Sequence, residues 1–260
     1  MTQSSTPPQE NMQTRPSSFS RPSLATLFTR FPVTYTLILI TLLIYIAQEL
    51  SIFLLDGDIV ISYGAKINQA IYDGEYWRFL TPIFVHAGIW HIFVNMYSLN
   101  AIGPAVEGFF KSPRMLAVYL LSGITSVIFS LAFTTNASVG ASGAIFGLLG
   151  SLGTFLFLHK DSLGEAGKAY LRRIALVALL NLALGLAPSI DNWGHLGGLL
   201  AGSALAWYLG PRFELSWISD PGTNKMVEQR PWEKVWQRIF PAIAVMALLA
   251  YLAMLSPFSQ

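Results

Sequence analysis

A serine, two histidines and an asparagine lie within or beside long apolar stretches of this chain. Ser142 lies in the run GASGAIFG, His91 and Asn95 in HAGIWHIFVN, and His195 in GHLGGLLAG. Polar side chains in such stretches are costly, and a serine next to a histidine base is the simplest activated nucleophile. These residue types predict nucleophilic catalysis, provided that the fold brings Ser142 and His195 together across 53 positions of sequence.

Hydrogen-bond donors for a developing negative charge are expected at the same place. Ser142 stands where a helix would begin, and the first N–H groups of a helix lack internal partners and carry the positive end of its dipole. His91 and Asn95 are four residues apart, so both can reach one point and act as oxyanion-hole donors. Gly140 and Gly143 leave room for a carbonyl group to approach the backbone.

The sequence offers no clear third catalytic member. Asp191 precedes His195 by four residues, in an expected loop, so we predict a Ser–His dyad rather than a triad. His86 is expected to anchor a loop by bonding to the backbone. His86, His91 and His195 could in principle bind zinc, but an HExxH motif is absent and no carboxylate neighbours the three histidines. We therefore expect neither a metal nor a cofactor.

The elements that must position these residues are helices in a lipid bilayer. The chain is 53% hydrophobic and 12% charged, whereas soluble domains carry about 25% charged residues. Uncharged apolar runs predict an all-α polytopic membrane bundle, with no nucleic-acid partner. The seven predicted spans are at about residues 33–55, 89–106, 115–133, 142–158, 174–187, 194–209 and 239–255.

The distribution of lysine and arginine predicts the orientation of this bundle. Fourteen of the sixteen fall in the N-terminal tail or near residues 107–114, 159–173 and 210–238, which leaves Lys66 and Arg78 on the other side. The positive-inside rule therefore places the N-terminus in the cytoplasm and Ser142 towards the outer side. The fourth span would rise about 24 Å at roughly 1.5 Å per residue. This is less than the hydrocarbon thickness of about 30 Å, so Ser142 is expected below the outer membrane surface.

Small residues predict how the fourth and sixth spans approach each other. Gly143 and Gly147 form a GxxxG motif, and Gly198 and Gly202 follow His195 at helical spacing. Such faces let helix backbones come close in lipid. A close crossing would bring the Ser142 hydroxyl to the His195 imidazole.

Four motifs, taken together and in order, resemble the rhomboid family of intramembrane serine proteases. They are WR in the first outer loop, HAGIWHIFVN, GASG and GHLGG, within a six-helix core of about residues 33–210. The resemblance implies a protease of the cell membrane that cuts transmembrane segments of other proteins near the outer face. It implies Ser142 as nucleophile and His195 as general base. It places in the oxyanion hole the side chains of His91 and Asn95 and the amides of Ala141 and Ser142.

The same resemblance implies the surroundings of the site. Phe146 occupies the place where some members stack a tyrosine on the catalytic histidine, and Gly140, Gly143, Gly198 and His86 would support the site. The fifth span and the loop at residues 188–193 would form a lateral gate. The whole chain would comprise a disordered cytoplasmic tail (1–32), the protease core (33–210), a cytoplasmic linker (211–238) and a seventh C-terminal helix (239–260).

Two functions from different classes remain open at this point. The first is a protease, whose substrates would carry helix-weakening residues and a small residue before the cut. The second is a non-catalytic rhomboid-like protein that binds membrane clients. Such binders usually lack the serine or the histidine, and this chain has both Ser142 and His195.

Overall fold

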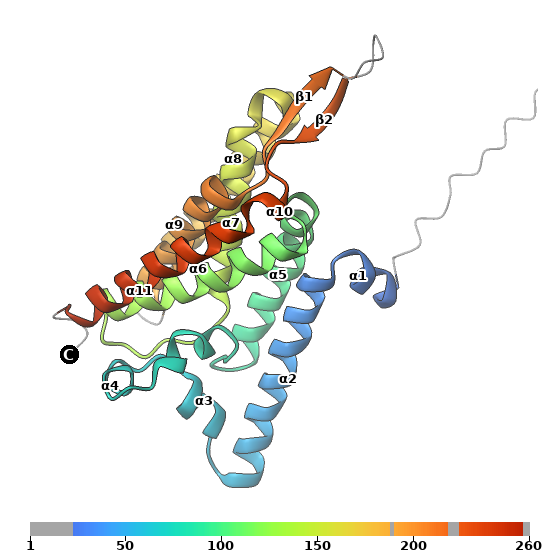
Figure 1. Cartoon of the computed structure of the whole chain (residues 1–260). Coiled ribbons are helices and arrows are strands. Elements are labelled where there is room, and N and C mark those ends of the chain that lie inside the picture. Colours follow the sequence, from blue (N-terminus) through green and yellow to red (C-terminus); the bar gives the residue numbers. More distant parts are fainter. Residues whose placement is uncertain (1–22, 188–189, 218–223, 257–260) are drawn as a thin grey trace, which may run out of the picture.

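Long helices form most of the regular structure in a computed structural model that describes residues 23–187, 190–217 and 224–256 (Figure 1). Each of the seven predicted apolar runs falls on one of these helices, so the predicted all-α polytopic architecture is confirmed. The long helices are α2 (Pro32–Leu55), α5 (Ile89–Phe110), α6 (Ser112–Phe133), α7 (Ser142–Leu158), α8 (Lys160–Leu184), α9 (Asn192–Leu209) and α11 (Ile239–Met254).

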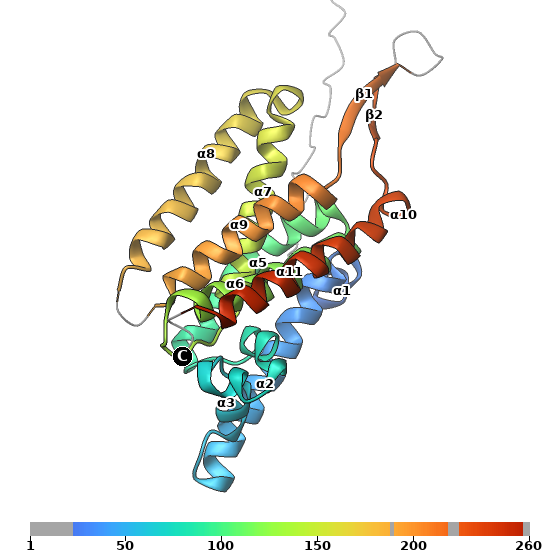
Figure 2. The same cartoon turned by 60° about the vertical axis from the view of Figure 1, so that its left-hand side comes forward.

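The helices run alternately up and down, so that their ends form two opposite sides. We call one side the Ser142 end: α2 ends there, and α5, α7 and α9 begin there (Figures 1 and 2). The connection from α2 to α5 also lies at the Ser142 end and contains α3 (Ile59–Gly64), α4 (Asn68–Tyr72), η1 (Tyr76–Phe79) and η2 (Thr81–Ile83). The short helix α1 (Leu24–Arg30) and a β-hairpin lie at the opposite end.

Burial separates the central helices from the peripheral ones. Among the described residues, three stretches are long and apolar enough to cross a membrane: Pro32–Leu55, Ser112–Phe133 and Trp232–Met254. The last includes α10 (Trp232–Val235) and η3 (Trp236–Arg238). In their most apolar windows, 61% of residues are buried for Ser112–Phe133 but only 6% for Trp232–Met254. Helix α6 is therefore central, whereas α11 packs against it from outside (Figure 2). Ala253 is the one buried residue of α11.

Glycines let α7 pack tightly between α6 and α9. A Cβ atom added at Gly198 would overlap the carbonyl oxygen of Gly143, and one at Gly202 would overlap that of Gly147. On the other side of α7, a Cβ at Gly147 would overlap the hydroxyl of Ser122. The predicted close crossing of the fourth and sixth spans is thus confirmed, and it is backbone against backbone.

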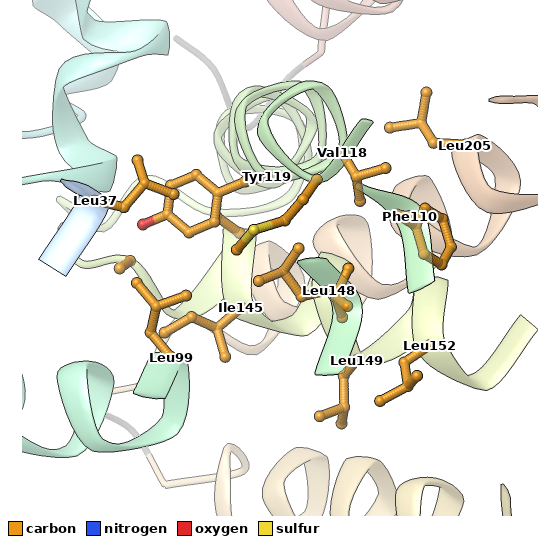
Figure 3. Packing of buried hydrophobic residues seen from close by; sticks show 14 of the residues in the cluster. Leu37, Leu99, Phe110, Val118, Tyr119, Ile145, Leu148, Leu149, Leu152 and Leu205 are labelled. Atoms are coloured by element: carbon orange, nitrogen blue, oxygen red, sulfur yellow. The ribbon is translucent and has the colours of Figure 1, made fainter. Parts of the chain in front are cut away.

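Apolar side chains hold the remaining sides of α7. Leu148 and Leu152 of α7 are fully buried together with Phe110 of α5 and Tyr119 of α6. Figure 3 shows Leu148, Ile145 and Leu149 of α7 within this group, with Leu99 of α5 beside them. The helix that starts at Ser142 is therefore fixed on several sides, which is a requirement for a site at its first residue.

Polar groups tie the helices together at the end opposite to Ser142. The Glu107 carboxylate accepts hydrogen bonds from the Val33 and Thr34 amides at 2.9 Å each and from the Ser112 hydroxyl at 2.7 Å. Since the first N–H groups of a helix lack internal partners, this buried carboxylate caps α2. It also fixes the junction between α5 and α6.

The structure differs from the sequence predictions in three segments. Helix α8 begins at Lys160 rather than near residue 174, and Gly164, with φ +60°, interrupts its first turns. Leu24–Arg30 form α1, where a disordered tail was predicted; residues 1–22 lie outside the described part. The predicted linker contains an antiparallel hairpin of β1 (Phe213–Trp217) and β2 (Asn224–Glu228), which single-sequence patterns did not indicate.

Candidate active site

Ser142 and His195 meet at the Ser142 end of the bundle. The Oγ atom of Ser142 lies 2.9 Å from Nε2 of His195, a hydrogen-bond distance. Ser142 is the first residue of α7 and His195 lies in the first turn of α9, so the glycine-lined crossing of these two helices creates the contact. The predicted pairing of this hydroxyl and this imidazole is present in the structure.

An aromatic ring fixes the plane of the imidazole. The Phe146 ring, one turn along α7 from Ser142, stacks on His195 with the ring centroids 4.4 Å apart and the planes 16° from parallel. The stacking restricts rotation of the imidazole and keeps Nε2 directed at the serine. To accept the hydroxyl proton, Nε2 must be unprotonated, which requires the hydrogen of the neutral imidazole to be on Nδ1.

Asp191 organises the start of α9 without bonding to His195. Its Oδ1 accepts a hydrogen bond from the Gly194 amide at 2.9 Å and caps the helix. Within the described part of the chain, neither Asp191 Oδ2 nor His195 Nδ1 has a hydrogen-bond partner. The geometry is that of a dyad.

His91 and Asn95 lie directly beside Gly140, in the segment that leads into Ser142. Gly140 has φ +115°, which favours glycine, and a Cβ there would come within 2.6 Å of His91 Nε2 and 3.7 Å of Asn95 Nδ2. His91 Nδ1 accepts the Ala87 amide at 3.4 Å, so Nε2 bears the proton and is a donor. One amide hydrogen of Asn95 bonds to the His91 carbonyl at 2.9 Å, which orients the other.

His86 holds the segment that leads into Ser142 through Ala141. Its Nε2 accepts the Ala141 N–H at 3.3 Å, and its Nδ1 lies 3.3 Å from the Phe84 carbonyl, in agreement with the predicted loop-anchoring role. Burial lowers the pKa of His86 to about 4, and the neighbouring His91 contributes to the decrease, so His86 is neutral near pH 7. The Ala141 N–H, expected in the oxyanion hole, is therefore directed at His86 in this structure.

Gln48 of α2 holds His86 in turn, and sequence reasoning missed it. Its amide accepts from the His86 N–H and donates to the His86 carbonyl, each at 3.0 Å. The side chain is 1% exposed. Gln48 is an uncharged polar residue inside the first apolar run, which predicts that its side chain makes a hydrogen bond. The sequence does not show that the partner is His86, 38 residues away.

A cavity of about 1490 Å³ opens from the Ser–His pair. Pockets for small ligands usually measure about 300–1,000 Å³, so this one has room for a larger guest such as a stretch of polypeptide. Residues of both α5 and α8 line the cavity, among them Val94, Ser98 and Val177. Asn181 of α8 donates to the Val177 carbonyl of its own helix and also lines the cavity.

The connection between α2 and α5 is folded around the WR motif. The buried Arg78 guanidinium donates to the carbonyls of Ala65 at 2.7 Å and Ser62 at 2.9 Å, and it pairs with Glu75 at 2.6 Å. Trp77 is half exposed and donates to the Tyr63 carbonyl at 3.1 Å. The two residues thus shape the loop, and neither lies within hydrogen-bond reach of the dyad.

The zinc alternative finds no support in the described residues. No group of three His, Asp or Glu side chains there is arranged to hold a metal ion. Both ring nitrogens of His86 already face protein groups. The chemistry that this donor set supports is proton transfer and hydrogen bonding.

Comparison with known proteins assigns the family. A model of the Rhomboid domain matches residues 73–212, more than half of the chain and the part that holds Ser142 and His195. Rhomboid protease GluP of Bacillus subtilis (strain 168) is 40% identical over 182 residues, which cover 68% of this chain and 34% of GluP. RHOMBOID-like protein 5 of Arabidopsis thaliana is 34% identical over 193 residues, covering 72% of this chain and 62% of that protein. The chain thus spans about one third to three fifths of the length of these relatives. It belongs to the rhomboid family of multi-pass membrane proteins.

Proposed function

We propose that this protein is a serine endopeptidase that hydrolyses peptide bonds within or near transmembrane segments of other membrane proteins. The observation that carries the proposal is the 2.9 Å contact between Ser142 Oγ and His195 Nε2 at the mouth of a large cavity in an apolar bundle. A relative at 40% identity is named a rhomboid protease, which supports the same function.

In the proposed reaction, His195 acts as general base and Ser142 as nucleophile. Nε2 takes the hydroxyl proton while Oγ attacks the carbonyl carbon, and the same nitrogen then gives the proton to the leaving amine. Water afterwards hydrolyses the acyl-enzyme with His195 again as base. Phe146 keeps the imidazole in one plane through both steps.

The negative oxygen of the tetrahedral intermediate needs donors that are already in place. The His91 Nε2–H and the Asn95 amide lie beside Gly140, and the Ser142 N–H lies at the start of α7. We assign these three groups to the oxyanion hole. The Ala141 N–H would join them only if it left His86.

A substrate must partly unwind, because a helix in lipid satisfies its own backbone hydrogen bonds. We infer that substrates carry glycine or proline near the cut, which weakens the helix. We also infer a small residue before the cut, because the close approach of the α7 and α9 backbones leaves little room for side chains beside Ser142. Entry between α5 and α8 is favoured by burial: α8 buries only Gly167, Ile174 and Ala178, whereas most of α7 is buried. The loosely packed α8 is therefore the element assigned to a lateral gate.

The deciding experiment combines cleavage of a reporter that carries a transmembrane segment with covalent labelling by a fluorophosphonate. We expect the wild-type protein to cleave the reporter and to be labelled. Ser142→Ala should abolish both, and His195→Ala should abolish cleavage, with the thermal melting of both variants unchanged. A wild-type protein that binds the reporter without cleavage or labelling would favour the client-binding alternative instead.

A further inference from the structure

Lys66 has a buried ammonium group next to segment 134–141, which leads into the proposed oxyanion hole. It lies between α3 and α4, and its exposed fraction is 0%. Its Nζ donates to the carbonyls of Asn136 at 2.9 Å, Thr134 at 3.0 Å and Ser130 at 3.4 Å. These carbonyls lie in the last turn of α6 or just after it, where the helix dipole is negative and a cation is stabilised.

The backbone of the same lysine forms hydrogen bonds with Ser138 of this segment. The Lys66 N–H donates to the Ser138 carbonyl at 2.9 Å, and the Ser138 N–H donates back to the Lys66 carbonyl at 3.1 Å. Segment 134–141, which joins α6 to α7, is thus held by Lys66 through both main chain and side chain. Asn68 adds a bond from its amide to the Thr134 carbonyl at 3.2 Å.

This segment ends in the residues that form the site. Two positions after Ser138, Gly140 donates to the Pro82 carbonyl at 2.8 Å and packs against His91 and Asn95. A shift of Ser138 would therefore move Gly140 relative to both side-chain donors. It would leave the contact between Ser142 and His195 intact, because that contact depends on the crossing of α7 and α9.

We propose that Lys66 is a positioning residue whose positive charge holds segment 134–141 in register, so that the oxyanion hole is formed before substrate arrives. The inference rests on the proposed protease function and deepens it. Removal of the charge should slow attack on the carbonyl group while the Ser–His pair remains assembled.

Titration of Lys66 gives this inference a readout that a purely structural role lacks. Burial lowers the pKa of Lys66 to about 8, and the charge of Asp191 partly opposes the decrease. Among the described residues, the atoms that accept hydrogen bonds from the ammonium are the backbone carbonyl oxygens of Ser130, Thr134 and Asn136, which do not titrate. The ammonium form predominates below pH 8, so activity should fall as pH rises through about 8.

Stability should change with pH in the opposite direction. In the unfolded chain this lysine keeps its proton up to its ordinary pKa of 10.5. Between about pH 8 and 10 the unfolded state therefore binds more protons, and this group makes the free energy of unfolding rise with pH. A loss of activity above pH 8 cannot then be ascribed to unfolding through Lys66.

The test measures reporter cleavage and the rate of Ser142 labelling between pH 6.5 and 9.5. Lys66→Met should lower both rates about 10- to 100-fold at pH 7, the scale of a displaced catalytic group, and should remove the decline near pH 8. Lys66→Arg keeps the charge, so it should retain more activity than Lys66→Met and show no decline up to pH 9.5. Lys168→Met, at an exposed ion pair with Glu165, is the control and should behave as wild type.

Amide hydrogen exchange tests the same point without catalysis. Ser138 and Gly140 should exchange faster in Lys66→Met than in wild type or Lys168→Met, after correction for intrinsic rates.

Unchanged labelling and unchanged exchange in Lys66→Met would overturn the inference, as would a flat wild-type profile of activity against pH through pH 8. If the wild-type protein neither cleaves nor is labelled, the proposed function is wrong, and exchange alone decides the role of Lys66. If Lys66→Met does not fold, the wild-type and Lys66→Arg profiles decide.

Discussion

At the scale of single residues, the site depends on which nitrogen of each histidine carries a proton. In the proposed mechanism, His195 presents an unprotonated Nε2 to Ser142. His91 instead presents a protonated Nε2 to Gly140, because its Nδ1 accepts the Ala87 amide. His86 uses both nitrogens to hold backbone groups. In the proposed mechanism, the three histidines thus act as a base, a donor and a support.

Asn95 allows the proposed oxyanion hole to be tested. Asn95→Ala removes one of several donors, so the rate of reporter cleavage should fall about 10- to 1000-fold without being abolished. The fall should appear in the cleavage rate at saturating substrate. Asn100→Ala in the same helix is the control and should cleave normally, because Asn100 is exposed and, among the described residues, accepts a hydrogen bond from the exposed Tyr35 hydroxyl. Equal rates in the two variants would exclude Asn95 from the oxyanion hole.

At the scale of elements, the crossing of α7 and α9 decides whether the dyad exists. The carbonyl oxygens of Gly143 and Gly147 fill the space that side chains at Gly198 and Gly202 would need. No adjustment of a flexible side chain can relieve such an overlap, because the obstacle is backbone. The two helices would have to separate, and the Ser142 hydroxyl would leave His195.

Gly202→Ala should therefore destabilise the protein and reduce cleavage, although Gly202 lies two turns from His195. Overpacking of this kind costs about 1–3 kcal/mol. Thermal melting and Ser142 labelling measure the two effects. Gly153→Ala is the matched control on α7, since a Cβ there would make an ordinary contact of 3.7 Å with Ile174. A Gly202→Ala protein that melts and reacts like Gly153→Ala would contradict backbone packing at this crossing.

At the scale of the whole molecule, the two ends of the bundle differ in how many lysines and arginines they carry and in what these residues bind. Lys66 and Arg78, the two cations predicted on the outer side, are both buried in the connection between α2 and α5, where they bind carbonyl groups. At the opposite end, Arg114 pairs with Glu228 at 2.7 Å and anchors the hairpin. The two cations at the Ser142 end thus stabilise the fold of the connection. The lysines and arginines on which the predicted orientation depends lie at the opposite end.

The predicted orientation can be measured because the chain contains no cysteine. Single cysteines would be introduced at Thr135, exposed at the Ser142 end, and at Lys168, exposed at the opposite end. In intact cells a membrane-impermeant maleimide should label Thr135→Cys, and it should label Lys168→Cys only after permeabilisation. The cysteine-free wild-type chain is the control, and the reverse pattern would overturn the assigned orientation.

Local features explain how much of this fold was predictable. The apolar runs mark all seven long helices, because lipid requires each span to satisfy its backbone internally. The start of α8 was missed because its first turns carry Lys160, Asp161 and Glu165, which remove the apolar signal without preventing a helix. The hairpin was missed because its strands are five residues each, too short to establish a period.

The sequence by itself determined the spans, the small-residue faces, and the identity and order of the polar groups that define the candidate site. Only the tertiary structure decided which residues these polar groups contact. It set the 2.9 Å contact of Ser142 with His195, the use of the Ala141 amide by His86, and the burial of Lys66 under segment 134–141. The physical reason is range: helix formation in lipid depends on neighbours a few residues apart, whereas a hydrogen bond between distant segments exists only after packing has fixed both.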